Sequence, residues 1–134
     1  MRYDHGNPTD YEQLLLELIN QARTNPTAEG IRLDEETADY ALDMRQYKPN
    51  FFTDIRKEFA PYPKAPPLAF NPYLLKSAQA YSQKMTLNDF FSHYGDFKHH
   101  SNPTTRAYAQ GYSGIVGENI SGDGADTTDR KSVV

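Results

Sequence analysis

The sequence predicts a single, mostly helical domain, and three observations support this prediction. The chain has 134 residues, enough for one hydrophobic core but not for two domains of ordinary size. Hydrophobic residues make up 37% of it and aromatic residues 13%, which excludes wholesale disorder. Apolar residues recur at helical spacing in several segments, whereas few segments alternate as strands do.

Charge and cysteine content exclude several classes of function. The formal net charge is −4 and Lys and Arg form no run, so bulk charge does not favour binding to nucleic acid or to an anionic membrane. The chain has no cysteine, hence neither disulfides nor thiol chemistry. The longest apolar run, Leu14 to Leu16, is far shorter than a transmembrane helix.

The first half of the chain predicts three helices and a turn. Thr9 and Glu12 have the spacing of a capping box before a helix that should end ahead of Pro26. Asn25 and Pro26 can then open a short turn. Further helices are expected over 34–46 and 50–60. The apolar face of the first helix consists of Leu14, Leu15, Leu18, Ile19 and Ala22.

The second half predicts a long helix, a short helix and a loop. A stiff extended connector, 61–67, precedes a helix that Asn71 caps and that frays near Asn88. Asn102 opens a short helix that Gly111 can close, and the remainder is predicted to be glycine-rich loop. The buried stripe of the long helix should contain Leu74, Leu75, Ala78, Tyr81 and Met85. We expect the two long helices to pack together through Leu15, Ile19, Leu74, Ala78 and Tyr81.

Four segments, in order, resemble the front portion of a bacterial-type CAP (SCP-like) domain. This is the superfamily of cysteine-rich secretory, antigen 5 and pathogenesis-related proteins. The segments are LLLELINQARTNP, PPLAFNPYLLKSAQAYSQKM, NDFFSHYG and RAYAQGYSGIVGENI. They contain an Asn-x-x-Arg at Asn20 and Arg23, a Pro-Leu-x-aromatic helix entry, a Phe-Ser-His and a Gly-Glu-Asn-Ile. The resemblance runs from about 14 to 120 and leaves an unusual insert over about 31–63.

The resemblance implies an α+β fold, the α-β-α sandwich of CAP domains, of which these residues supply mainly the helical front portion. Residues 1–134 would then form one incomplete domain that ends in a flexible acidic tail over about 121–134. We expect such a chain to be marginally stable as a monomer and to self-associate through uncovered apolar surface.

The same resemblance implies a central cleft with two histidines and two acidic residues, which in some members binds a divalent metal. His93 corresponds to the first histidine and Glu118 to the glutamate of Gly-Glu-Asn, while their counterparts in the family lie beyond Val134. Ser92 and Asn119, which adjoin these two positions, are candidate binding residues.

The residues themselves leave three interpretations of His93 open: a hydrogen-bonded core residue, a metal ligand or an acid-base catalyst. A neutral imidazole suits zinc-like ions and exchanges protons near pH 7. Glu118 could fix its tautomer or contact a bound water. Phe90 and Phe91 are expected to anchor the His93 loop in the core, and Gly114 and Gly117 to allow close approach of the other segment.

For the other polar and aromatic groups, an ordinary structural role is the default interpretation. His99 and His100 could bind a metal but adjoin each other in a polar loop, where solvation is the default. Asp123, Asp126 and Asp129 lack EF-hand spacing, so a flexible acidic tail is favoured over a calcium site. A group of aromatic residues could line a lipid groove, although core packing is the default interpretation. Its members are Phe51, Phe52, Phe59 and Tyr62.

The sequence therefore favours a secreted, non-catalytic CAP-type domain that binds a small ligand, a lipid or a divalent metal at the His93–Glu118 cleft. The alternatives are a metal-dependent hydrolase and a structural or adhesive module of a larger extracellular protein. No Gly-x-Ser-x-Gly pattern supports covalent hydrolysis. We expect an extracellular or periplasmic location, with a signal peptide already removed, because MRYDHGNPTD lacks an apolar h-region.

Overall fold

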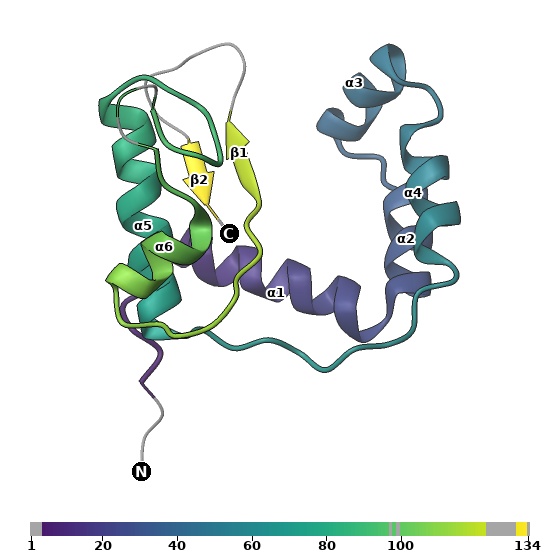
Figure 1. Ribbon diagram of the computed structural model, residues 1–134. Helices are drawn as coiled ribbons and strands as arrows, with labels where there is room; N and C mark the ends of the chain where they lie inside the picture. Colours follow the sequence, from purple (N-terminus) through teal and green to yellow (C-terminus); the bar gives the residue numbers. More distant parts are fainter. Residues whose placement is uncertain (1–3, 97, 99, 123–130, 134) are drawn as a thin grey trace. The chain divides into compact units, whose positions relative to one another are not determined.

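A computed structural model describes residues 4–96, 98, 100–122 and 131–133 of the chain (Figure 1). The chain divides into two compact units. Thr9–Ala69 form the first, here called the helical unit. Met1–Pro8 together with Phe70–Val134 form the second, here called the site unit, because His93 and Glu118 both belong to it.

Helix α1 (Asp10–Thr24) opens the helical unit and begins at the predicted capping box. The amide of Glu12 donates to the Thr9 hydroxyl (3.3 Å), and the amide of Thr9 donates to the Glu12 carboxylate (2.6 Å). Two donors that the helix start would otherwise leave unpaired are thereby satisfied.

The next two helices have different bounds from those predicted. The short turn expected at Asn25 is a full helix, α2 (Pro26–Asp34), and the helix expected over 34–46 begins five residues later as α3 (Asp39–Tyr47). Between them, the Glu36 carboxylate accepts from the amides of the two residues that follow it (2.9 and 3.1 Å). Such local side-chain bonds replace helical ones, which explains the break.

Helix α4 (Phe51–Phe59), predicted at this position, lies side by side with α2 (Figure 1). Gly30 allows the close approach of the two helices. A Cβ atom at Gly30 would lie 3.1 Å from Arg56 Cα and 3.1 Å from Phe59 Cβ. Any larger residue would therefore push the α2 and α4 backbones apart.

Two arginines tie the helical unit together in place of a large apolar core. Arg45 donates to the carbonyl oxygens of Asp34 (2.7 Å) and Glu36 (2.6 Å), and its guanidinium lies 4.8 Å from the centre of the Phe52 ring. Arg56 ion-pairs with the Asp34 carboxylate (3.1 Å) and holds the pKa of Asp34 below its ordinary value. These contacts link α2, α3 and α4.

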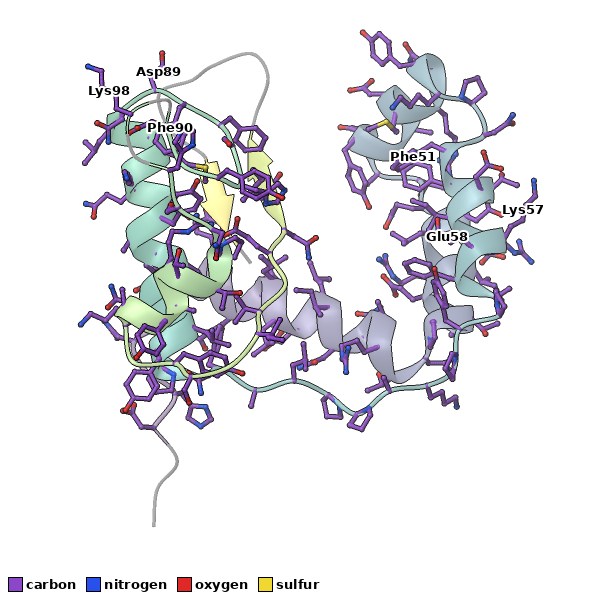
Figure 2. The ribbon with its side chains drawn as sticks, in the orientation of Figure 1. Phe51, Lys57, Glu58, Asp89, Phe90 and Lys98 are labelled. Carbon is purple, nitrogen blue, oxygen red and sulfur yellow. The ribbon has the colours of Figure 1, made fainter. Side chains whose placement is uncertain are left out.

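The aromatic group of the helical unit belongs only in part to its core. Phe52 is buried, and its ring meets that of Phe51 edge-on at 5.1 Å. Phe51, labelled in Figure 2, and Tyr62 are exposed, and the Tyr62 ring lies 6.2 Å from that of Phe59. Core packing thus accounts for Phe52 but not for the whole group.

The Asn-x-x-Arg motif holds the extended connector along α1. Asn20 donates its amide to the Leu68 carbonyl (2.9 Å) and accepts from the Leu68 amide (2.6 Å), as a strand partner would. Arg23 donates to the Pro66 carbonyl (3.1 Å) and accepts at its own carbonyl from the Ala65 amide (2.8 Å). The connector is extended, as predicted, and is fixed by these bonds.

Helix α5 (Pro72–Leu87) is the longest element of the site unit. The Asn71 side chain accepts from the first amides of the helix, as the sequence predicts. Leu75, Tyr81 and Met85 of the predicted stripe are buried, and its two other members are half-buried. These side chains form most of the core of the unit.

Helix α6 (Pro103–Ala109) begins at a second capping box, in which the Asn102 side chain accepts from the Thr105 amide (2.9 Å). It is followed by Gly111, whose φ of +101° is disfavoured for any residue with a side chain. A Cβ at Gly111 would also lie 3.2 Å from the Tyr73 ring. Glycine therefore closes this helix, as predicted.

The final segment differs from the predicted loop. Strands β1 (Ile120–Gly122) and β2 (Lys131–Val133) pair antiparallel, with Ile120 opposite Val133, and β2 lies against α5. Three-residue strands are too short for their alternation to stand out in a sequence. Within the described residues, β1 and β2 make up the sheet, so the fold consists of helices with a small β component. The full sandwich remains an expectation.

Two sequence predictions concern longer-range features. In the described part of the chain, no helix combines the length and the apolar character needed to cross a membrane. Packing of α1 on α5 stays a prediction, because the two helices belong to different units.

Replacing Leu75 by Ala should destabilise the protein by about 2–5 kcal/mol, because it removes a buried side chain from the core and leaves a cavity. Leu75 is 7% exposed, whereas Leu87 on the same helix is 76% exposed. Leu87→Ala is therefore the matched control, with an expected loss of less than about 0.5 kcal/mol. Urea unfolding measures both, and equal losses would show that the core does not lie where α5 places it.

Candidate functional site

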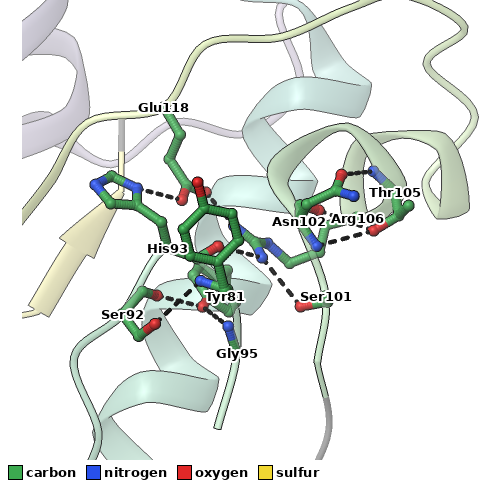
Figure 3. A network of polar contacts seen from close by, with 10 residues as sticks. Tyr81, Ser92, His93, Gly95, Ser101, Asn102, Thr105, Arg106 and Glu118 are labelled. Carbon is green, nitrogen blue, oxygen red and sulfur yellow. Dashed lines mark hydrogen bonds and ion pairs between the residues drawn. The ribbon is translucent and has the colours of Figure 1, made fainter.

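A buried tyrosine fixes the loop that carries His93. The Tyr81 hydroxyl donates to the Ser92 carbonyl (2.5 Å) and accepts from the Gly95 amide (2.9 Å), so peptide groups on both sides of His93 are tied to α5 (Figure 3). The backbone leaves α5 through Asp89, whose φ of +47° lies in the left-handed region that aspartate tolerates better than most residues.

The structure brings His93 and Glu118 together. His93 Nδ1 lies 3.0 Å from Glu118 Oε1, although the two residues are 25 positions apart in the sequence. A carboxylate oxygen accepts, so Nδ1 carries the hydrogen in this bond. Nε2 of a neutral His93 is then an acceptor, and the side chain is 45% exposed. The arrangement presents one imidazole nitrogen to solvent in a defined tautomer.

Arg106 links the parts of this cluster. Its Nη2 ion-pairs with Glu118 Oε2 (2.5 Å), and its Nη1 donates to the His93 carbonyl (3.0 Å) and to the Ser101 hydroxyl (3.0 Å). The guanidinium stacks over the Tyr81 ring, with its carbon 3.5 Å from the ring centre. One side chain therefore joins α6, the His93 loop, the Glu118 segment and α5 (Figure 3).

The Arg106–Glu118 pair is shielded from water. The two side chains are 12% and 6% exposed, and both carboxylate oxygens of Glu118 are engaged, one by Arg106 and one by His93. Charge-assisted bonds of this kind are among the strong hydrogen bonds of proteins. The opposite charges also cancel, so this part of the cluster has little net attraction for a cation.

Glu118 also lines a pocket between α5, α6 and the 112–118 segment, with a volume of about 270 Å³. Carbon-rich side chains form most of its wall. The apolar lining residues are Leu74, Ala78, Pro103, Ala107, Ile115 and Val116. Ser77, Tyr112, Gly117 and Glu118 complete the lining. The pocket thus has an apolar wall with a carboxylate at its edge.

Comparison with known families identifies the family of this chain. The family model for CAP, the cysteine-rich secretory protein family, matches residues 16–130. The chain belongs to the CAP family. No curated protein and no solved structure matches it significantly. The match spans His93, Arg106 and Glu118, and this CAP domain has no cysteine despite the name of its family.

The other residues predicted for this site differ in their surroundings. The Ser92 hydroxyl accepts from the Tyr94 amide (3.1 Å), which shapes the loop. Asn119 is exposed, and its side chain has no hydrogen-bond partner among the described residues. The prediction that Phe91 anchors the loop in the core is wrong, because Phe91 is 52% exposed. Phe90, labelled in Figure 2, instead packs edge-on against Tyr81 at 6.1 Å.

The glycines predicted to allow close approach near Glu118 are not equivalent. A Cβ atom on Gly117 would meet nothing within 4 Å, so no close approach requires a glycine there. A Cβ on Gly114 would lie 2.7 Å from the Tyr112 ring, which is a contact within the same segment and not with the His93 loop. His99, Asp123, Asp126 and Asp129 lie outside the described residues.

Sequence reasoning missed Arg106 and Ser101 and assigned Tyr81 only a packing role. Arg106 lies within the RAYAQGYSGIVGENI segment that carries the family resemblance, and it is the one charged residue of α6. A single charged residue in a short helix is only a weak signal of a functional role. Nothing in the sequence shows that its partner would be Glu118, 12 residues further on.

The described residues of this CAP domain do not form a complete metal site. Within them, no group of three or more His, Asp or Glu side chains is placed to hold a metal ion. Zinc sites normally use three or four protein ligands. In the cluster, His93 offers one nitrogen, and Glu118 is already bound at both oxygens.

Replacing Arg106 by Gln should destabilise the protein by about 3–5 kcal/mol, because the shielded Glu118 carboxylate loses its cation. His93→Ala should cost less than about 1 kcal/mol, because His93 is half exposed. The double variant Arg106→Gln with Glu118→Gln should recover part of the loss. Urea unfolding of the three variants measures these changes in the free energy of unfolding. A small loss of stability in Arg106→Gln would show that the ion pair does not hold the unit together.

Proposed function

We propose that this CAP domain is a secreted, non-catalytic binding module that takes up the apolar end of a small molecule in the pocket beside Glu118. The observation that carries the proposal is the pocket itself. Its wall is mostly apolar, while the polar residues Glu118, Ser77 and Tyr112 also line it. Binding sites for small molecules usually have this combination of an apolar lining and a few polar groups.

The size of the pocket limits its ligand. Its volume of about 270 Å³ is just below the range of about 300–1,000 Å³ typical of sites for drug-sized ligands. It therefore suits a short aliphatic group, either a whole small molecule or the end of a longer lipid. Ile115 lines it while remaining 93% exposed, so part of the apolar wall faces solvent before a ligand binds.

The polar cluster supports a binding role rather than a catalytic one. Neither ring nitrogen of His93 is hydrogen-bonded to a hydroxyl group in the described part of the chain, so His93 has no serine or threonine to activate there. The Ser92 and Ser101 hydroxyls are instead used in shaping the loop and in holding Arg106. A secreted location is supported by the description of the family as secretory.

We expect Ile115→Ser to weaken binding of 1-hexanol at least threefold, because the substitution removes apolar surface that the probe would cover. Ile115 is almost fully exposed, so its replacement should leave the stability of the protein nearly unchanged. Titration of the labelled protein with 1-hexanol, followed by NMR shifts of residues 112–118, measures the affinity.

Leu87→Ser is the matched control, since Leu87 is also an exposed aliphatic residue but does not line this pocket. It should leave the 1-hexanol affinity unchanged. The proposal fails if the wild type shows no saturable shift of residues 112–118. It also fails if the Leu87 and Ile115 variants lose affinity to the same degree.

A second candidate function is divalent-metal binding at His93. The observation in its favour is that Glu118 holds Nδ1 and leaves Nε2 exposed, an orientation in which carboxylates often hold metal-binding histidines. A metal there is also what the metal-dependent hydrolase alternative requires. Within the described residues, no group of three or more His, Asp or Glu side chains is placed to hold a metal, so a complete site would need further ligands.

Zinc should bind weakly, and His93→Ala should weaken it further, whereas His99→Ala should have little effect. Isothermal titration calorimetry with zinc chloride on the two variants measures this. Loss of binding in His99→Ala with full binding in His93→Ala would assign the metal to the His99–His100 segment. If the protein binds neither zinc nor 1-hexanol, a structural or adhesive role becomes the better explanation.

A further inference from the structure

We propose that helix α3 of the helical unit is a docking surface for a basic amphipathic helix of a partner protein. Two features of α3 support this: an apolar stripe that the unit leaves exposed, and carboxylates beside the stripe that have no cation. This surface and its ligand differ from the pocket beside Glu118 and the ligand expected there, so neither proposal depends on the other.

One side of α3 attaches the helix to the rest of the unit. Ala41 is fully buried, and Arg45, one turn later, donates to the carbonyl oxygens of Asp34 (2.7 Å) and Glu36 (2.6 Å). Positions i and i+4 lie on the same side of a helix. A methyl group and a guanidinium therefore anchor α3, and its larger apolar side chains are left for another role.

Those larger side chains form a stripe along a second side of α3. Tyr40, Met44 and Tyr47 follow one another at positions i, i+4 and i+7, and they are 56%, 36% and 84% exposed. Tyrosine and methionine are enriched in the contact surfaces of protein complexes. Residues at this spacing are also the anchors through which amphipathic helices bind their partners.

Carboxylates border the apolar stripe along one edge. Asp39 and Asp43 lie one turn apart, and Asp43 lies one turn before Tyr47. Both are exposed, and neither carboxylate has a hydrogen bond or ion pair with any described residue. The basic residue of α3, Arg45, is bound to backbone carbonyls on the side that faces the unit. The exposed surface of α3 is therefore both apolar and negatively charged.

The charge of the whole helical unit has the same sign. Its range, 9–69, contains 11 acidic and 7 basic residues, so the net charge of −4 of the chain belongs to this unit. Such a surface attracts a cationic partner and repels an anionic membrane. In a two-fold dimer through α3, the same carboxylates of both copies would meet at one interface. Apolar and charge complementarity together thus favour a basic amphipathic helix.

Two residues of this surface also have structural roles. Asp39 lies in the first turn of α3, where a carboxylate interacts favourably with the helix dipole. The amides of the two residues that follow Glu36, and also the Tyr40 hydroxyl, hold the pKa of Glu36 below its ordinary value. Neither role applies to Asp43 or Tyr47, so substitutions at these two positions test docking rather than folding.

The test uses a fluorescein-labelled helical peptide with leucines along one face and lysines along the other. Its binding to the full chain is followed by fluorescence anisotropy at low salt. Tyr47→Ser should weaken binding at least about fivefold, because the contact loses an aromatic anchor. Asp43→Asn should weaken it about threefold at low salt, and this difference should disappear at high salt because the charges are exposed.

Two variants and one peptide serve as matched controls. Leu42→Ser removes an exposed aliphatic side chain from α3 that lies outside the stripe, and Glu17→Gln removes an exposed carboxylate from α1. Each should change the affinity less than about twofold. A peptide with glutamates in place of the lysines should bind at least about tenfold more weakly. Urea unfolding of all four variants checks that they remain folded.

Several outcomes would overturn the proposal. One is the absence of saturable binding of the lysine peptide to the wild type, and another is an equal loss of affinity in Leu42→Ser and Tyr47→Ser. Equal binding of the glutamate peptide would exclude charge complementarity. Binding of phosphatidylglycerol vesicles that Tyr47→Ser abolishes would assign α3 to a membrane. A dimer that dissociates in Tyr47→Ser, as measured by sedimentation, would assign it to a second copy of the chain.

Discussion

The ion pair between Arg106 and Glu118 is the interaction on which the site unit depends. Arg106 belongs to α6 and bonds both to Glu118 and to the His93 carbonyl, so one guanidinium connects α6 with the two other segments of the cluster. Both side chains are largely shielded, so each depends on the other for its charge to be tolerated. The Tyr81 ring beneath the guanidinium and the Tyr81 hydroxyl, which holds the loop backbone, connect the pair to the buried face of α5.

Each of the two units is stabilised internally in a different way, without disulfides. The helical unit combines a glycine contact, Gly30 against α4, with arginines that bind backbone carbonyls and a carboxylate. In the site unit, most of the buried apolar side chains lie on α5. In this cysteine-free member of the CAP family, helix caps, apolar packing and a few shielded charges hold the arrangement around His93.

Local signals in the sequence predicted most of the helices, because the interactions that start and end a helix lie within a few residues. The caps at Thr9, Asn71 and Asn102 all form as expected. Contacts between distant segments were predictable only where the family resemblance supplied them, as for His93 and Glu118. Arg106 was missed because its partner is set by how α6 packs, and the exposure of Phe91 because its neighbour Phe90 fills the space beside Tyr81.

Arg106 cannot be assigned to structure or to binding alone. It pairs with Glu118, which lines the apolar pocket, and its own side chain lines a second groove, between α5 and α6. A residue that holds the fold by satisfying a shielded carboxylate is already positioned and already desolvated, so a ligand need not supply the energy to order it. The contact that stabilises the unit therefore also holds Glu118 in place beside the apolar pocket, so a substitution at Arg106 should alter the stability of the unit and the wall of that pocket together.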